Sequence, residues 1–390
     1  MLVLSFYYHP DLSAGSFRTT ALVAALRERA PPGAHFEVLT TVPNRYHTFS
    51  LDAPEDEGDD TVHIHRIRLP THRSDMSGQS RAFLTFARRA RAYTRGKQYD
   101  IVFATSSRLM TAALGAWISR SAGARLYLDI RDLFVDTISE VLPRAVLGMR
   151  YALSALESWT MQRAERINLV SQGFEGYFRA RYPRSCLSFF TNGIDDAFLA
   201  VEPKQTAAAA SMGPRVVLYA GNIGEGQGLH NILPGLARAL AGRAHFIVIG
   251  DGGRRAALER ALQEEGVRNV ELRPPVSRER LLAEYREADV LFLHLGALSA
   301  FEKVLPSKLF EYAATGKPIL AGVAGYAARF VREEIANAGV FAPCSVPEAV
   351  RAFEHLRIET QPRPEFIAKF SRAHIARAMA DDILTLARPE

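Results

Sequence analysis

Short apolar runs alternate with longer amphipathic stretches along the chain. Apolar runs of roughly four to eight residues are typical of buried parallel strands, and the longer stretches are typical of helices. In the first half, the pattern predicts strands at 2–8, 36–41, 100–105, 125–130 and 167–171, with helices at 16–30, 81–97, 111–123 and 144–165. Such alternation predicts a mainly parallel sheet with helices on both faces.

The pattern pauses between about residue 191 and residue 213 and then restarts. The second half has predicted strands at 215–221, 245–253, 269–276, 289–294 and 318–323. We therefore expect two doubly wound α/β domains, at 1–200 and 201–365, with a hinge near 195–212 and a final helical segment at 366–390. A ligand cleft between two such domains is the first place to expect a site.

Composition adds little to this fold prediction, but it excludes several classes of protein and of site. Of 390 residues, 48% are hydrophobic and 23% are charged, which is enough apolar material for two cores. Only Cys186 and Cys344 are present, so a disulfide framework or a cysteine-rich metal site is excluded and a reducing, cytoplasmic compartment fits. The first residues favour a strand and its loop over a signal peptide, and no apolar run approaches the ~20 residues of a membrane span.

The net charge of +6 is concentrated in part on the predicted helix 81–97. One side of that helix carries apolar residues and the other arginines: Phe83, Phe86, Ala87 and Ala90 against Arg81, Arg88, Arg91 and Arg95. A basic amphipathic helix suits an anionic lipid surface. A packed helix with solvated arginines has the same pattern. No nucleic-acid-binding motif is present, so we expect no nucleic-acid partner.

The stretch FEKVLPSKLFEYAATGKPIL, residues 301–320, gathers charges around one proline. It follows an apolar strand, and Pro306 and Ser307 suit the start of a helix with Ser307 as N-cap. Ligands of open α/β sheets bind at such strand-to-helix joins, and the first N–H groups of a helix favour an anion. Lys303 and Lys308 would add full positive charges there.

Glu311, four residues after Ser307, does not suit a phosphate. A carboxylate accepts hydrogen bonds from sugar hydroxyls, so the local pattern indicates a phosphate next to a polyol, as in a nucleotide sugar. A solvated helix start with incidental charges would explain the same stretch.

Two further strand-to-helix joins are rich in small polar residues. Residues 219–233 contain Gly221, Gly224, Gly226 and Gly228, and Gly15 and Ser16 precede the first predicted helix. Glycines let backbone amides approach a phosphate closely. The spacings match neither the dinucleotide fingerprint nor the P-loop. Together, the three joins favour a phosphate-bearing ligand between the domains.

The order of these motifs resembles a family 4 glycosyltransferase of the two-domain GT-B fold, with two Rossmann-like domains. The resemblance covers essentially the whole chain and is carried by AGSFRT, DIRDLFVD, FTNGID, LYAGNIGEGQGL, VIGDGG and PSKLFEYAATGKPIL. It is strongest to the retaining bacterial subgroup that builds capsule, exopolysaccharide or O-antigen. It implies a hexosyl- or N-acetylhexosaminyl-type transfer from a nucleotide-diphosphate sugar, with UDP or GDP first among the donors. The acceptor would be a lipid-linked saccharide at the inner face of the plasma membrane. The last helix would cross back onto the first domain.

The resemblance also implies roles for particular residues. Glu311 matches the second glutamate of the family's Glu-x7-Glu motif, which holds the nucleotide ribose. The donor-binding set it implies is Glu311, Ser307, Leu309, Asn222, Gly224, Gln227, Gly250 and Val276. Gly15, Ser16 and Arg131 would form the acceptor or phosphate loop. The family needs no metal or other cofactor for departure of the leaving group.

Two departures from the family pattern concern charge. Where the first motif glutamate is expected, this chain has Lys303, with Glu302 one position out of register. Where many relatives place an arginine and a lysine to neutralise the diphosphate, it has Asn222 and Gln227. We therefore assign Lys308 and Lys303 as candidate catalytic cations, because preplaced positive charge stabilises a departing diphosphate.

Asp132 is a third candidate catalytic residue. It follows a predicted strand of the first domain, and Arg131 could pair with it or contact an acceptor phosphate. It could also simply cap the next segment. A retaining transfer need not use a protein base, because the leaving phosphate oxygen can take the acceptor proton.

Three other functions fit parts of the pattern. A nucleotide-sugar 2-epimerase of the same fold would bind the same donor, and a non-catalytic sugar- or nucleotide-binding subunit would explain the missing basic pair. The intact PSKLFEY segment favours an enzyme over that subunit. A nicotinamide-linked dehydrogenase would need a G-x-G-x-x-G motif after the first strand, which is absent.

Overall fold

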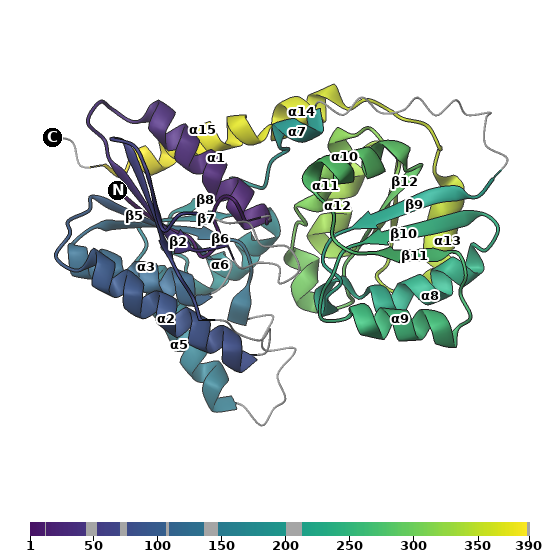
Figure 1. Cartoon of the computed structure of the whole chain (residues 1–390), viewed down its shortest axis with the longest axis horizontal. Coiled ribbons are helices and arrows are strands. Elements are labelled where there is room, and N and C mark those ends of the chain that lie inside the picture. Colours follow the sequence, from purple (N-terminus) through teal and green to yellow (C-terminus); the bar gives the residue numbers. More distant parts are fainter. Residues whose placement is uncertain are drawn as a thin grey trace. The chain divides into compact units, whose positions relative to one another are not determined.

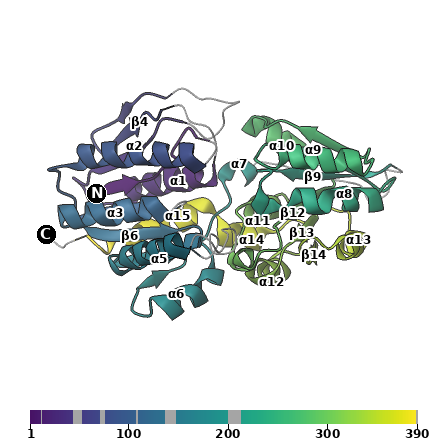
Figure 2. The same cartoon turned by 90° about the horizontal axis from the view of Figure 1, so that it is seen from below.

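A computed structural model describes residues 1–11, 13–43, 53–70, 76–106, 109–135, 147–199 and 213–387. The chain divides into two compact units (Figures 1 and 2). The first unit comprises Met1–Gly193 together with Arg372–Glu390, and the second comprises Ile194–Ser371. The prediction placed the domain boundary at residue 200 and the start of the final segment at 366.

The first unit is built on an eight-stranded sheet of order β3-β4-β2-β1-β5-β6-β7-β8. Its strands are β1 Leu2–Leu4, β2 Phe36–Thr41, β3 Asp56–Gly58, β4 Val62–Ile67, β5 Ile101–Ser106, β6 Arg125–Ile130, β7 Arg166–Leu169 and β8 Leu187–Ser188. Every pairing is parallel except that of β3 with β4. β1 lies at the centre and is fully buried, as a strand covered on both faces must be.

Helices cover both faces of this sheet (Figure 1). They are α1 Ala14–Arg29, α2 Met76–Thr94, α3 Leu109–Ala122, α5 Leu147–Gln162, α6 Glu175–Arg181 and α15 Arg372–Leu384, with the short 3-10 turn η2 Gln172–Phe174. α1 and α15 share one core with β1, β2, β5 and β6, in which Leu22, Leu26, Met379 and Ile383 are buried. α2, α3 and α5 lie on the opposite face (Figure 1).

The second unit has a six-stranded, all-parallel sheet of order β11-β10-β9-β12-β13-β14. Its strands are β9 Arg215–Ala220, β10 Ala244–Ile249, β11 Val270–Arg273, β12 Val290–His294, β13 Ile319–Gly322 and β14 Ala338–Phe341. The order reverses between β9 and β12, so a crevice is expected at the carboxyl ends of these two strands.

Helices of the second unit also form two layers. The elements are α7 Asp196–Leu199, η3 Glu225–Gln227, α8 Leu229–Ala239, α9 Arg255–Glu264, α10 Arg278–Glu287, η4 Ser299–Lys303, α11 Lys308–Ala314, α12 Gly325–Glu334, α13 Val346–His355 and α14 Pro364–Phe370. α8, α9 and α13 share a core with one face of the sheet. Where α11, α12 and α14 meet, the rings of four phenylalanines pack in tilted and edge-to-face contacts: Phe310, Phe330, Phe366 and Phe370.

The two parallel sheets with helices on both faces confirm the predicted α/β class. Several element bounds differ from the prediction. β1 ends at Leu4 rather than at residue 8, and the sequence did not predict β3, β4, β8 and β14. The predicted helix at 366–387 is interrupted, because Ser371 has a non-helical ψ of 126°. Residues 144–146 of the predicted helix 144–165, and most of the predicted hinge 195–212, lie outside the described residues.

Candidate functional site

The loop after β9 runs against the loop after β10 in the second unit. Gly250 has a φ of +155°, and a Cβ built there would lie 1.8 Å from the carbonyl oxygen of Gly221. Only glycine tolerates such an approach. The N–H of Ile223 also donates to the carbonyl of Asp251 at 2.9 Å. The predicted donor residues Gly224 and Gly250 therefore lie on two tightly joined strand ends.

Asn222 and Gln227, which stand in place of a basic pair, contact each other. The Asn222 Nδ2 donates to the Gln227 Oε1 at 2.8 Å, and the backbone N–H of Gly224 donates to the same oxygen at 3.3 Å. The phenol of Tyr219 donates to the carbonyl of Asn222 at 2.6 Å. These neutral side chains make the loop rigid but provide no positive charge.

Lys308 and Glu311 lie in the first turn of α11 and form an ion pair. The Lys308 Nζ is 3.2 Å from the Glu311 Oε2, and both groups are 3.4 Å from the phenol oxygen of Tyr285 on α10. The exposed fractions of the two side chains are 27% for Lys308 and 13% for Glu311, so solvent still reaches both. The sequence placed both residues at the start of one helix, but it gave no sign of Tyr285.

Lys308 also lies against the loop after β9. A Cβ built on Gly221 would be 3.2 Å from the Lys308 Cε and 3.3 Å from the Tyr219 phenol oxygen. Burial alone would lower the Lys308 pKa, but the nearby Glu311 carboxylate outweighs it and holds that pKa above its ordinary value. The ammonium is therefore charged at neutral pH. The structure thus brings Lys308, Glu311 and the Asn222–Gln227 loop to one end of the sheet.

Other predicted donor residues are less clearly part of this cluster. Ser307 occupies the N-cap position of α11, but its side chain makes no capping hydrogen bond. Its backbone is already helical, with φ −60° and ψ −28°, which corrects the prediction of a side-chain cap. Leu309 is fully buried, and none of it is open to solvent. Val276 is half-buried in the loop between β11 and α10, and Lys303 ends η4.

In the first unit, Gly15 and Ser16 lie in the first turn of α1 rather than before it. The helix begins two residues before the predicted start at residue 16, because the Ser13 hydroxyl accepts the N–H of Ser16 at 3.1 Å and caps the helix earlier. Arg131 is directed toward this turn: it donates to the Ala14 carbonyl at 3.5 Å, and a Cβ on Gly15 would lie 3.8 Å from its guanidinium. Gly15, Ser16 and Arg131 are therefore neighbours, as the phosphate-loop hypothesis requires.

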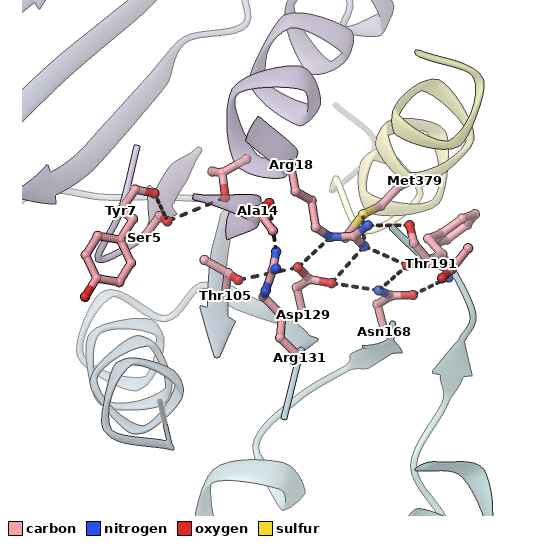
Figure 3. A network of polar contacts seen from close by, with 12 residues as sticks. Ser5, Tyr7, Ala14, Arg18, Thr105, Asp129, Arg131, Asn168, Thr191 and Met379 are labelled. Carbon is pink, nitrogen blue, oxygen red and sulfur yellow. Dashed lines mark hydrogen bonds and ion pairs between the residues drawn. The ribbon is translucent and has the colours of Figure 1, made fainter. Parts of the chain in front are cut away.

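Asp129 has a structural role that the sequence did not indicate (Figure 3). Arg18 on α1 donates to its two oxygens at 2.9 and 3.0 Å, and Asn168 on β7 donates at 2.7 Å. Arg18 also binds the carbonyls of Phe190 and Thr191. Burial would raise the Asp129 pKa, but Arg18 outweighs it and lowers that pKa. This pair is almost fully buried, whereas Asp132 is an exposed residue.

The described residues contain no group of three or more His, Cys, Asp or Glu side chains that could hold a metal ion. Among the described helices, none is both long and apolar enough to cross a bilayer. The cluster in the second unit combines a charged ammonium, a carboxylate and a glycine-rich loop. Such a set can neutralise phosphate charge and accept hydrogen bonds from hydroxyls.

Two family models match the chain almost end to end. Residues 15–192 match the model described as a glycosyl transferase 4-like domain, and residues 202–371 match the model of glycosyl transferases group 1. The matched regions contain the candidate residues of the first and second units, respectively.

Individual relatives agree with these matches. A putative colanic acid biosynthesis glycosyl transferase, WcaI of Escherichia coli K12, is 33% identical over 217 residues, which cover 51% of each chain. The alignment thus spans about half the length of that relative. Among solved structures, a sucrose-phosphate synthase of Thermosynechococcus elongatus has a TM-score of 0.73 at 16% identity, covering 99% of this chain and 98% of that one. The Anabaena protein Alr3699/HepE, solved with UDP-glucose, has a TM-score of 0.67 at 14% identity, covering 98% of each chain.

Proposed function

Because the chain belongs to the family 4-type glycosyltransferases of GT-B fold, we propose that it moves a sugar from a nucleoside-diphosphate donor to a saccharide acceptor, with retention of the anomeric configuration. The observation that carries this proposal is the position of Lys308, which pairs with Glu311 and lies against Gly221. Charge for the leaving diphosphate and an acceptor for ribose hydroxyls then come from one helical turn.

Binding of the donor would divide the roles within this turn. The Glu311 carboxylate would accept hydrogen bonds from the ribose, and the Lys308 ammonium would turn toward the diphosphate beside Gly221. Asn222 and Gln227 would offer amide hydrogen bonds rather than charge. Because a full positive charge offsets the growing charge of the departing phosphate more strongly than neutral amides do, Lys308 would carry most of this stabilisation.

The chemical step would take place on one face of the sugar. The bond from the anomeric carbon to the phosphate oxygen breaks while the acceptor oxygen bonds to the same carbon. The acceptor proton passes to the leaving phosphate oxygen, which releases a nucleoside diphosphate. No protein nucleophile is required, so the exposed Asp132 would orient the acceptor hydroxyl instead.

We expect the donor nucleotide to be UDP or GDP and the acceptor to be a lipid-linked saccharide of surface polysaccharide assembly. WcaI, whose name refers to colanic acid biosynthesis, supports the acceptor class, and the UDP-glucose bound to the Anabaena structure supports the donor class. A protein working on such an acceptor would lie at the inner face of the plasma membrane, held by peripheral contacts.

The experiment has two stages. Thermal shift with UDP, GDP, ADP and TDP identifies the base, because a ligand at 100 times its Kd stabilises by about 2.7 kcal/mol. The matching sugar nucleotides are then incubated with and without a polyprenyl-diphosphate-linked saccharide. Release of nucleoside diphosphate that requires the acceptor supports transfer. Conversion of the donor alone indicates a 2-epimerase, and nucleotide binding without either reaction indicates a non-catalytic subunit.

A further inference from the structure

A groove of about 830 Å³ lies at the edge of the sheet in the second unit. Its floor is the edge strand β14, and it is also lined by residues of α12, of α13 and of the segment that follows α13. β13 separates β14 from β12, which borders the donor cluster at its end. The groove is thus a different place from the candidate donor site.

The open side of β14 has unused backbone groups. The carbonyls of Asn337 and Phe341 accept from Ile319 and Val323, so the odd-numbered residues of the strand face β13. The alternation of a parallel ladder then turns the N–H and C=O groups of Ala338 and Val340 outward. No hydrogen bond is described for these outward groups within the described part of the chain. Such an edge is a template for another strand.

The walls of the groove are basic. Arg332 at the end of α12, Arg351 on α13 and Arg357 beyond it are all exposed lining residues. Within the described ranges, none of the three has an ion pair. One carboxylate, that of Glu348, also lines the groove and accepts the backbone N–H of Ala342 at 2.9 Å, so the described lining carries three arginines against one glutamate. Two further carboxylates nearby are paired elsewhere: Glu354 with Arg243, and Glu334 with Lys369.

We propose that this groove binds an extended acidic segment of a partner protein, which adds to β14 as a seventh strand. Backbone hydrogen bonds to Ala338 and Val340 would hold the segment, as in other complexes formed by strand addition. Side chains of a strand alternate between the two faces, and arginines stand toward both α12 and α13. The segment would therefore carry acidic residues on both of its faces.

Charge also decides against a second copy of this chain as the occupant. Pairing β14 with its own copy would bring two sets of these three arginines together, and like charges at an interface disfavour association. An alternative use of the arginines is protective, since charged flanks commonly prevent edge strands from associating at all. Binding measurements separate the two uses, because a purely protective edge binds no segment of either charge.

The probe is a fluorescein-labelled ten-residue peptide of glutamate and threonine, and the readout is fluorescence anisotropy. We expect saturable binding that weakens as salt is raised. A matching lysine–threonine peptide should not bind. The same acidic peptide with an N-methyl group on every residue should bind at least about ten-fold more weakly, because strand addition needs its N–H groups. Equal affinity for the methylated and unmethylated peptides, or no binding, would overturn the proposal.

Protein variants test the same contacts from the other side. Val340→Pro removes one outward N–H of an edge strand, a position where proline is tolerated, and should reduce affinity at least about ten-fold. Arg332→Glu with Arg351→Glu should abolish binding of the acidic peptide and create binding of the lysine peptide. Arg260→Glu, a matched charge change on the exposed side of α9, should leave affinity unchanged. If the wild type forms dimers that Val340→Pro dissociates, the occupant is a second copy of this chain and the proposal is overturned. Binding of inorganic polyphosphate that Val340→Pro leaves intact would also overturn it.

Discussion

The Nδ1 atom of His294, at the end of β12, lies 2.6 Å from the carbonyl oxygen of Gln227. The Nε2 atom of the same ring accepts the backbone N–H of Cys344 at 3.0 Å. Because an accepting nitrogen carries no hydrogen, Nδ1 carries it and donates to Gln227. The N–H of Gly296 also donates to the carbonyl of Gly226 at 2.8 Å. The end of β12 therefore fixes the loop that carries Asn222 and Gln227.

Variants of His294 should separate its two hydrogen bonds. An asparagine amide at position 294 can replace the Nδ1 donor, whereas a glutamine amide reaches the position of Nε2 instead. We expect all variants to lose about 1–3 kcal/mol of stability, because each leaves a buried polar group unpaired. His294→Gln and His294→Phe should also raise the KM for the donor. His294→Asn should keep the KM of the wild type. Similar KM values in all three would show that the ring is purely structural.

The pH dependence of stability should reveal the buried neutral ring. Burial lowers the pKa of His294 from 6.5 to about 4. Below pH 6.5 the unfolded chain therefore binds a proton that the folded chain does not, and stability falls as the pH drops toward 4, by up to ~3 kcal/mol. Urea unfolding of the wild type and of His294→Asn measures this pH-dependent contribution to the free energy of unfolding. The stability advantage of the wild type should shrink steadily between pH 6.5 and pH 4, and a constant difference would contradict the assignment.

Local patterns predicted much of the fold, because burial imposes them directly. The spacing of Phe83, Phe86 and Ala90 predicted the apolar side of α2, and these residues are indeed buried. The start of α1 was missed because several nearby residues can cap a helix, and Ser13 does so instead of a later one.

The candidate site was predictable only where its residues are neighbours in sequence. Lys308 and Glu311 share a helical turn, so their proximity follows from helical geometry. The contact of Lys308 with Gly221, and the bond between His294 and Gln227, join residues on different strands and helices. Such contacts depend on sheet order, which local pattern does not encode. The Arg18–Asp129 pair escaped prediction for the same reason.

Glu311 should contribute to nucleotide binding rather than to folding. Glu311→Gln keeps the shape and one acceptor, so we expect moderately weaker binding of the nucleoside diphosphate. Glu311→Ala should weaken it further, because no acceptor for the ribose remains. Calorimetric titration gives both affinities, with Glu264→Ala, an exposed position on α9, as the control. Unchanged affinity in both Glu311 variants would remove this residue from the donor site.

The basic side of α2 should bind anionic lipid. Arg81, Arg88 and Arg95 are exposed, and Leu84 beside them is 53% exposed, whereas Arg91 lies 4.4 Å from the ring centroid of Trp117. Each basic residue at an anionic surface contributes about 1 kcal/mol. Co-sedimentation with phosphatidylglycerol vesicles should fall with salt and drop sharply when Arg81, Arg88 and Arg95 become glutamate. Equal binding to neutral vesicles, or none to either, would contradict a peripheral membrane role.

The two lysines near the donor cluster should differ in their effect on catalysis. Lys308 lies against Gly221 and remains charged, so its loss should slow single-turnover transfer ~100–1000-fold, the usual effect of removing one group that stabilises the transition state. Lys303 ends η4, a separate element before α11, so we expect a smaller effect from Lys303→Ala. A catalytic cation lowers the transfer rate more than the ground-state affinity for the donor, so both are measured for Lys308→Ala, Lys303→Ala and the double variant. Each variant is first checked for folding by its thermal melt. Transfer at the wild-type rate by the double variant would leave Asn222, Gln227 and backbone N–H groups as the only support for the leaving diphosphate.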